Sequence, residues 1–168
     1  MKAPILLALL TVLLSSCGQF SGTDSAPEKP RSQNVPPGRF IAMWDKKTNG
    51  TQWTQAVSQA LDQLGSDLLT KVPNDSAAYC PSYPHLSRDR RKAFWIYLIS
   101  AMTWKESNFK PEVKYAEDMW DNRGQRVISR GLLQISYESA NGFGCRIQKD
   151  EDLHDPETNL ACGVRILN

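Results

Sequence analysis

Apolar residues between Thr51 and Lys71 recur at the spacing of an amphipathic helix. They lie three or four positions apart, which places them on one face: Trp53, Val57, Ala60, Leu61, Leu64 and Leu68. Pro73 cannot continue a helical hydrogen-bond ladder, so we expect this helix to end before it. A loop with two further prolines follows, over residues 74–86.

Two later segments also predict helices. Ser87 is suited to cap the start of a helix that runs to about Glu106. A third helix is expected to begin at Asp155, because Pro156 then occupies the first helical position, which favours proline. Its apolar stripe consists of Leu160, Val164 and Leu167.

The region between the second and third helices predicts the only strands. The segments VKYAEDMW (113–120) and GQRVISRGLLQI (124–135) flank a turn at residues 121–124, which indicates a β-hairpin. We therefore expect an α+β fold that is predominantly helical, with a small β-hairpin excursion.

The N-terminus has the pattern of an export signal. An apolar run from Ile5 to Leu14 follows Lys2 and is too short to cross a bilayer, which takes about 20 helical residues. The run ends in LSSC at Cys17, which resembles a bacterial lipobox. This resemblance predicts a signal peptide over residues 1–16 and a lipid anchor on Cys17. Gly18 after it implies, by resemblance to enteric lipoproteins, the outer membrane facing the periplasm. The alternative is an ordinary signal peptide cleaved nearby.

Composition divides the remaining chain into a tether and a domain. Residues 17–39 are rich in Ser, Pro, Gly and charge and predict a flexible tether, whereas residues 40–168 have enough apolar residues for one domain with its own core. The formal net charge is +2, and +1 without Lys2, so no basic field argues for nucleic acid. The sequence does not indicate an oligomeric state.

The cysteines fit an exported protein. If Cys17 carries lipid, then Cys80, Cys145 and Cys162 remain, and the sequence permits three pairings among them. We favour a disulfide between Cys145 and Cys162, which would contribute about 3 kcal/mol by restricting the unfolded chain. No metal or organic cofactor is implied, because the histidines are isolated, no two of these cysteines are closely spaced, and no glycine-rich phosphate loop is present.

Glu106 is the candidate general acid. On the second helix it extends a stripe formed by Trp95, Leu98, Ile99 and Met102. Desolvation by the stripe and the negative end of the helix dipole both disfavour the carboxylate anion, so the acid would hold a proton near neutral pH. The alternative is that the helix ends by Trp104 and Glu106 is a solvated loop charge.

Gln134 interrupts the apolar stretch SRGLLQIS at residues 129–136. A buried amide without partners costs about 1–3 kcal/mol, so Gln134 either pairs with a backbone turn or faces a ligand that supplies partners. Gly131 in the same stretch would let the backbone pass close to the substrate or to the catalytic helix.

Two motifs carry a resemblance over residues 93–167. ESNF at 106–109, followed by GLLQIS at 131–136, is similar to the motifs of soluble lytic transglycosylases and goose-type lysozymes. The resemblance implies a lysozyme-like fold that binds peptidoglycan glycan strands and cleaves the β-1,4 bond between N-acetylmuramic acid and N-acetylglucosamine. It makes Glu106 the acid and places Ser107 and Gln134 in the substrate cleft. Tyr115 and Tyr137 are possible stacking faces for sugar rings, or core residues.

The resemblance leaves the product open. A lytic transglycosylase forms a 1,6-anhydromuramic product, with one Glu as acid and then base, and this is the reaction we expect. A hydrolytic goose-like lysozyme needs a second carboxylate, for which the hairpin offers Glu117, Asp118 and Asp121. A non-catalytic peptidoglycan-binding lipoprotein is a further alternative. Because the last apolar helix reaches Asn168 without a cap, either the domain is C-terminally truncated or it is smaller than its relatives.

Overall fold

The structure is a computed structural model that describes residues 42–168. The predicted signal peptide, the predicted lipidation site at Cys17 and the predicted tether lie outside the described residues. Within residues 42–168, none of the helices has both the length and the apolar character needed to cross a bilayer.

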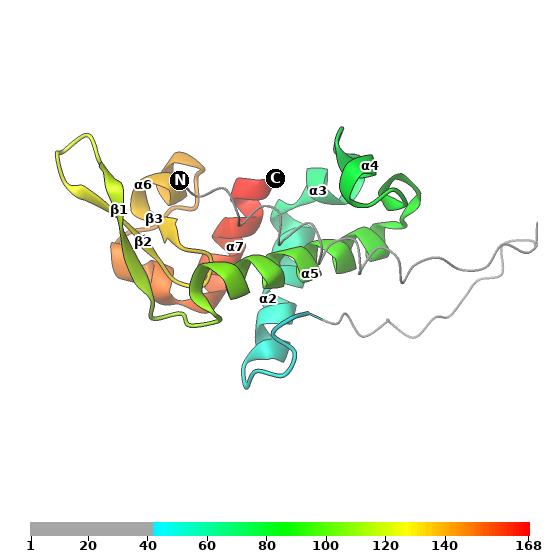
Figure 1. Ribbon diagram of the computed structural model, residues 1–168, viewed down its shortest axis with the longest axis horizontal. Helices are drawn as coiled ribbons and strands as arrows, with labels where there is room; N and C mark the ends of the chain where they lie inside the picture. Colours follow the sequence, from blue (N-terminus) through cyan, green and yellow to red (C-terminus); the bar gives the residue numbers. More distant parts are fainter. Residues whose placement is uncertain (1–41) are drawn as a thin grey trace, which may run out of the picture.

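The described chain is mainly helical, with one small antiparallel sheet (Figure 1). The helices are α2 (Gly50–Leu64), α3 (Ser66–Thr70), α4 (Ser76–Tyr79), η1 (Tyr83–His85), α5 (Arg88–Ser107), α6 (Tyr137–Gly142), η2 (Asp150–His154) and α7 (Pro156–Leu167). The strands are β1 (Lys114–Trp120), β2 (Arg126–Arg130) and β3 (Ile135–Ser136), in the order β1-β2-β3. The expected α+β, lysozyme-like fold with a hairpin excursion is confirmed.

Two of the predicted helix starts are confirmed by their caps. The Ser87 side chain accepts a hydrogen bond from the backbone N–H of Arg90 at 3.3 Å and begins α5. The Asp155 carboxylate accepts one from the N–H of Thr158 at 2.8 Å, with Pro156 at the first position of α7. Both caps satisfy N–H groups that a helix start otherwise leaves unpaired.

The first predicted helix is divided in two at Gly65. The apolar periodicity continues across this residue, but α2 ends at Leu64 and α3 begins at Ser66. The side-chain oxygen of Asn168 accepts hydrogen bonds from the N–H groups of Asp67 at 2.8 Å and Leu68 at 3.3 Å. A residue more than a hundred positions away thus satisfies the start of α3, a contact that periodicity cannot reveal.

The core lies where α2, α5 and α7 meet the segment between β2 and β3. Among helix pairs of the described chain, α2 and α7 have the most extensive contact, and α5 runs across the front of both (Figure 1). Fully buried apolar side chains come from each of these parts: Val57 and Leu61 of α2, Ile96 and Ile99 of α5, Leu160 and Val164 of α7, and Leu132 between β2 and β3. Trp44 before α2, Leu69 of α3 and Leu153 of η2 are also fully buried. The predicted disulfide between Cys145 and Cys162 is present and joins the loop after α6 to α7.

The hairpin contains a bulge in β1. Regular antiparallel pairing holds from Lys114, opposite Arg130, as far as Ala116, opposite Ile128. The next pair is Trp120 with Arg126, so residues 117–119 face a single residue of β2. Bulges bend a strand and turn its side chains away from simple alternation, so the orientation of residues 117–119 depends on their local contacts.

Candidate functional site

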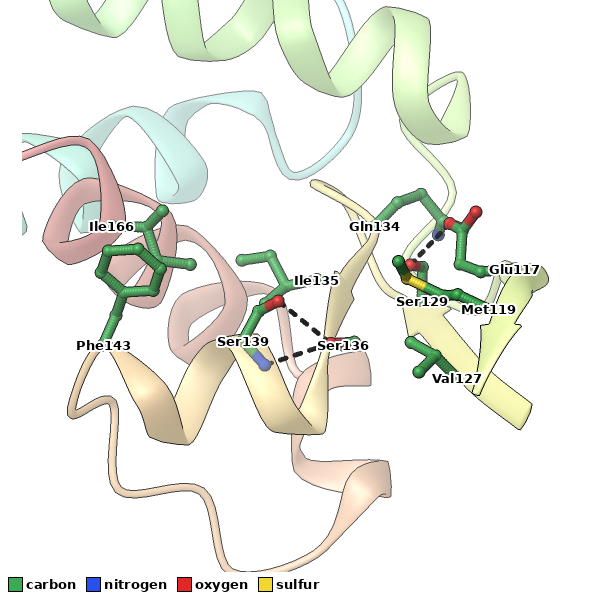
Figure 2. A pocket seen from close by; sticks show the side chains of 10 residues that line it. All are labelled: Glu117, Met119, Val127, Ser129, Gln134, Ile135, Ser136, Ser139, Phe143 and Ile166. Carbon is green, nitrogen blue, oxygen red and sulfur yellow. Dashed lines mark hydrogen bonds between the residues drawn. The ribbon is translucent and has the colours of Figure 1, made fainter. Parts of the chain in front are cut away.

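A pocket of about 300 Å³ lies between the hairpin and the segment from α6 to α7 (Figure 2). In the view of Figure 2, Glu117, Met119, Ser129 and Gln134 lie at one end, and Phe143 and Ile166 lie at the other. The lining is completed by Val127, Ile135, Ser136 and Ser139. The pocket therefore combines an end with carboxylate, amide and hydroxyl groups and an end that is apolar.

Glu106 lies in the last turn of α5, because the helix continues to Ser107 rather than ending by Trp104. Its side chain is exposed. The buried face of α5 passes through Ile99, Thr103 and Ser107, while Leu98 and Met102 are only partly buried. Glu106 therefore lies at the margin of the apolar face, and the enclosure by an apolar stripe that its spacing predicts is not observed.

Ser107 joins the two sequence motifs. It is 5% exposed, and its hydroxyl donates to the backbone oxygen of Leu132 at 2.9 Å, with the oxygen of Thr103 at 3.1 Å. The C-terminal end of α5 is thereby fixed to the GLLQIS segment. The structure gives Ser107 a place between these two elements and not in the lining of the pocket.

Gln134 combines the two alternatives that its sequence position raised. Its side-chain nitrogen Nε2 donates to the backbone oxygens of Gly131 at 2.8 Å and Val113 at 3.0 Å. The same side chain lines the pocket. Within residues 42–168 both of its hydrogen bonds come from Nε2 and none reaches its oxygen Oε1. Its φ of 48° is rare for a residue with a side chain, and such strain is common at functional sites.

The three hairpin carboxylates have different surroundings. Glu117 lines the pocket, and its Oε1 accepts a hydrogen bond from the Ser129 hydroxyl at 2.8 Å. The Asp118 side chain is 90% exposed and pairs with Arg126. Asp121 lies at the turn of the hairpin. Of the three predicted candidates for a second carboxylate, the structure therefore brings only Glu117 to the pocket.

Asp121 organises the hairpin turn. Its Oδ1 accepts hydrogen bonds from the backbone N–H groups of Gln125 at 2.7 Å and Arg123 at 2.9 Å, and its Oδ2 accepts one from the Arg123 side chain at 2.8 Å. The bond from the Gln125 N–H, with those from Arg123, lowers the pKa of the Asp121 carboxyl below its ordinary value. These contacts occupy both oxygens of this carboxylate.

The two predicted tyrosines are placed differently from each other. Tyr115 on β1 is 52% exposed, and Tyr137 at the start of α6 is partly buried against the core. Neither contributes to the lining of the pocket. Within residues 42–168, no cluster of three His, Cys, Asp or Glu side chains is arranged to hold a metal ion.

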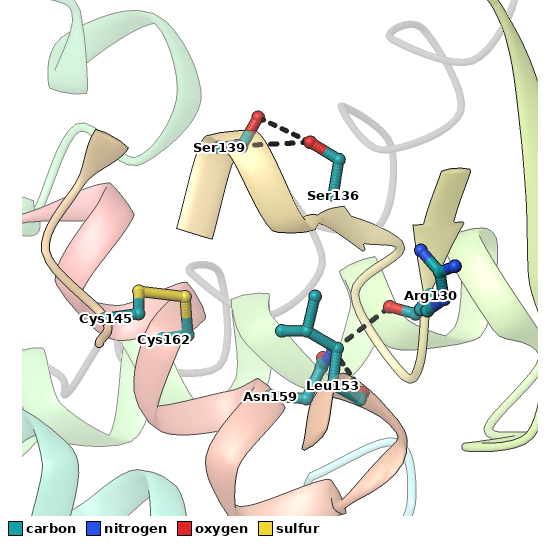
Figure 3. The surroundings of a disulfide bond; sticks show 7 residues. All are labelled: Arg130, Ser136, Ser139, Cys145, Leu153, Asn159 and Cys162. Atoms are coloured by element: carbon teal, nitrogen blue, oxygen red, sulfur yellow. Dashed lines mark hydrogen bonds between the residues drawn. A yellow bond between two sulfur atoms is a disulfide. The ribbon is translucent and has the colours of Figure 1, made fainter. Parts of the chain in front are cut away.

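Asn159 of α7 supports the segment that carries Gln134 (Figure 3). Its side chain is fully buried, donates to the backbone oxygens of Leu153 at 2.9 Å and Arg130 at 3.1 Å, and accepts from the N–H of Leu133 at 2.9 Å. We did not predict this residue from the sequence. The available signal was a polar residue beside the apolar stripe of the third helix.

Gly131 allows the close approach of this support. Its φ is +76°, and a side-chain carbon added there would lie 2.1 Å from the Leu153 oxygen and 2.4 Å from Asn159 Nδ2. The neighbours that require a glycine are thus η2 and α7, and not α5 or a substrate as its position in the motif suggested.

Comparison with known proteins places this arrangement in context. The profile of the Transglycosylase SLT domain matches residues 86–168. The solved wild-type structure (form 2) of a protein named DslA is 48% identical, with a TM-score of 0.73, over 74% of this chain and 69% of that one. Two Glu-to-Gln variants of DslA match with the same identity and coverage, at TM-scores of 0.72 and 0.73, and their substituted glutamates are eleven positions apart. No curated protein sequence matches the chain.

Replacing Asn159 tests whether its hydrogen bonds hold the Gln134 segment. We expect Asn159→Ala to lower the free energy of unfolding by about 3 kcal/mol, because buried backbone groups of Arg130, Leu133 and Leu153 lose their partners. Urea unfolding followed by circular dichroism measures this. Asn122→Ala, at an exposed position of the hairpin turn, is the matched control and should change stability by less than about 0.5 kcal/mol. Equal losses in the two variants would contradict the assignment.

The charge of Asp121 should stabilise the fold in a pH-dependent manner. Because its pKa is lower in the folded than in the unfolded protein, the stabilisation is complete above about pH 4 and disappears as the pH falls through the folded pKa. We expect Asp121→Asn to be less stable than wild type at pH 7, with a smaller difference at pH 3. Asp118→Asn, at an exposed ion pair, should differ little at either pH. A difference for Asp121→Asn that does not vary with pH would show that its charge has no such role.

Proposed function

Because the chain belongs to the transglycosylase SLT family, we propose that it cleaves the β-1,4 bond between N-acetylmuramic acid and N-acetylglucosamine in peptidoglycan. In this proposal Glu106 is the general acid and base, and the product carries a 1,6-anhydromuramic end. The family itself points to peptidoglycan degradation of the lytic transglycosylase type. The choice of residue and product is our proposal.

The hydrogen bond between Ser107 and Leu132 is the observation that carries the assignment of Glu106. It connects the end of α5, where Glu106 is the neighbouring residue, to the segment that carries Gln134 into the lining of the pocket. A carboxylic acid and a strained, anchored amide from two separate motifs are thereby held on elements that contact each other directly. A glycan has the hydroxyl and acetamido groups to pair with such an amide.

The proposed reaction uses one carboxyl group twice. Glu106 donates its proton to the glycosidic oxygen, the bond from this oxygen to the muramic C1 breaks, and positive charge develops on the sugar ring. The C6 hydroxyl of the same sugar then forms a bond to C1. Its proton passes to the Glu106 carboxylate, which restores the acid, so no water is consumed.

A second candidate is hydrolysis with Glu117 as the other carboxylate. Glu117 lines the pocket and is held by Ser129. Glu106 and Glu117 are also eleven positions apart, the same separation as the two glutamates replaced in the DslA variants. In this reaction Glu117 would take a proton from a water molecule that attacks C1, and the product would have a reducing muramic end.

We also propose that Cys17 anchors the protein by lipid to the outer membrane, facing the periplasm. The LSSC sequence at the end of the N-terminal apolar run supports this location. Peptidoglycan, the substrate class to which the family points, would be reached from that position through the chain between Cys17 and the domain. The non-catalytic binding lipoprotein is the outcome if no cleavage is detected.

Replacing Glu106 tests the proposed acid. Glu106→Gln cannot donate a carboxyl proton, so we expect release of soluble glycan from purified peptidoglycan to fall by about 10²–10⁴-fold, while sedimentation with the polymer is retained. Glu151→Gln, at an exposed position of η2, is the matched control and should cleave at the wild-type rate. A Glu106→Gln protein with an unchanged rate would remove Glu106 from the mechanism.

The product distinguishes the two candidate reactions. Mass spectrometry of the soluble fragments released by the wild-type protein should show 1,6-anhydromuramic ends, because the proposed attack is intramolecular. Reducing muramic ends would instead favour hydrolysis through Glu117. Digestion with a hydrolytic lysozyme, which leaves reducing ends, calibrates the assignment of the fragment masses.

A further inference from the structure

Glu117 lies at the start of the bulge in β1. The pairs Tyr115 with Ser129 and Ala116 with Ile128 are the last in regular register before it. A strand alternates its side chains between two faces, so Glu117 starts on the face of Tyr115 and hence of Ser129. The bulge then removes the next regular partner, and the direction of Glu117 depends on contacts that the strand pairing does not supply.

Arg126 supplies the first of these contacts, to the backbone. Its Nε donates to the backbone oxygen of Glu117 at 2.8 Å, and its Nη2 pairs with the Asp118 carboxylate. The guanidinium thus replaces the hydrogen bond that an ordinary strand neighbour would make. The same guanidinium also offsets the negative charge of Asp118, the exposed neighbour of Glu117.

Ser129 supplies the second contact, to the carboxylate itself. It is 6% exposed, and its hydroxyl donates to Glu117 Oε1 at 2.8 Å (Figure 2). Both side chains line the pocket. A buried hydroxyl on a paired strand has little freedom, so it fixes the carboxylate where a flexible glutamate would otherwise sample several rotamers.

From these contacts we propose that Ser129 is a positioning residue that holds the Glu117 carboxylate toward the glycan in the pocket. The proposal rests on the proposed function. A fixed carboxylate stabilises the positive charge that develops on the sugar in both candidate reactions, and in the hydrolytic reaction it also directs the proton of the attacking water. Ser129 acts only through Glu117, whereas Arg126 fixes the backbone from which Glu117 extends.

The proposal predicts a specific kinetic pattern. Loss of a hydrogen bond to a charged group corresponds to about a ten- to hundredfold change in rate, so Ser129→Ala should lower kcat on soluble peptidoglycan strands by that factor. KM should change less than about threefold, because the charge is needed most in the transition state. Ser129→Thr, which retains a hydroxyl, should restore most of the rate.

A double variant separates positioning from a general loss of structure. If Ser129 acts through Glu117, the Glu117→Gln/Ser129→Ala protein should be no slower than Glu117→Gln alone. Ser100→Ala is the matched control, since Ser100 is a fully buried serine within α5 and contacts Tyr97 and Met43 rather than the pocket. It should lower the thermal unfolding temperature without lowering kcat.

Two results would overturn the proposal: a wild-type kcat for Ser129→Ala, or losses from Ser129→Ala and Glu117→Gln that multiply in the double variant. Failure of the proposed function is recognised separately, because it appears as undiminished cleavage by Glu106→Gln. An active Glu106→Gln protein combined with coupled losses at Ser129 and Glu117 would retain the positioning role and reassign the acid.

Discussion

The three hydrogen bonds of the Asn159 side chain are the constraint on which the site depends. Two of them fix α7 to the backbone on both sides of Gly131, at Arg130 and Leu133, and so determine where the chain turns between β2 and β3. The third holds η2 through Leu153. Leu132 meets Ser107 and Gln134 reaches the pocket from within this turn. A buried amide with all its partners present is a specific connector, because no apolar side chain can satisfy two backbone oxygens and an N–H at once.

Electrostatics in the hairpin select one acid for the pocket. Asp118 is paired with Arg126, and Asp121 is paired with Arg123 and with backbone N–H groups of the turn. Both of these acids therefore have charged partners within the hairpin. Glu117, in contrast, accepts its hydrogen bond from a neutral group, the Ser129 hydroxyl. A hydroxyl orients a carboxylate without cancelling its charge, so Glu117 retains the charge that its proposed role requires.

Local signals in the sequence predicted the parts of this fold that depend on local chemistry. Ser87 and Asp155 cap helices, the turn at 121–124 closes a hairpin, and Cys145 bonds to Cys162, all as expected. The break at Gly65 and the support from Asn159 require partners distant in sequence, so periodicity did not reveal them.

The candidate acids were less predictable from the sequence. Glu117 was one of three equivalent acids there, because only the bulge and the hydrogen bond from Ser129 distinguish it. The exposure of Glu106 likewise depends on how α5 is rotated about its axis. The spacing of apolar residues predicted a buried face that includes Glu106, whereas the observed buried face includes the next residue, Ser107.

The disulfide constrains one end of the pocket covalently, whereas the hairpin at the other end contains no cysteine. Cys145 and Cys162 close a covalent ring that contains η2, and the pocket residues Phe143 and Ile166 lie just outside this ring at its two ends. The opposite end includes the outer part of the hairpin, beyond Ser129, where β1 and β2 pair without β3 beside them. Two paired strands alone are only marginally stable. If a glycan strand binds in this pocket, as we propose, it would contact a covalently closed segment at one end and the outer part of the hairpin at the other. We expect the hairpin to be the part that adjusts to the thickness of the strand.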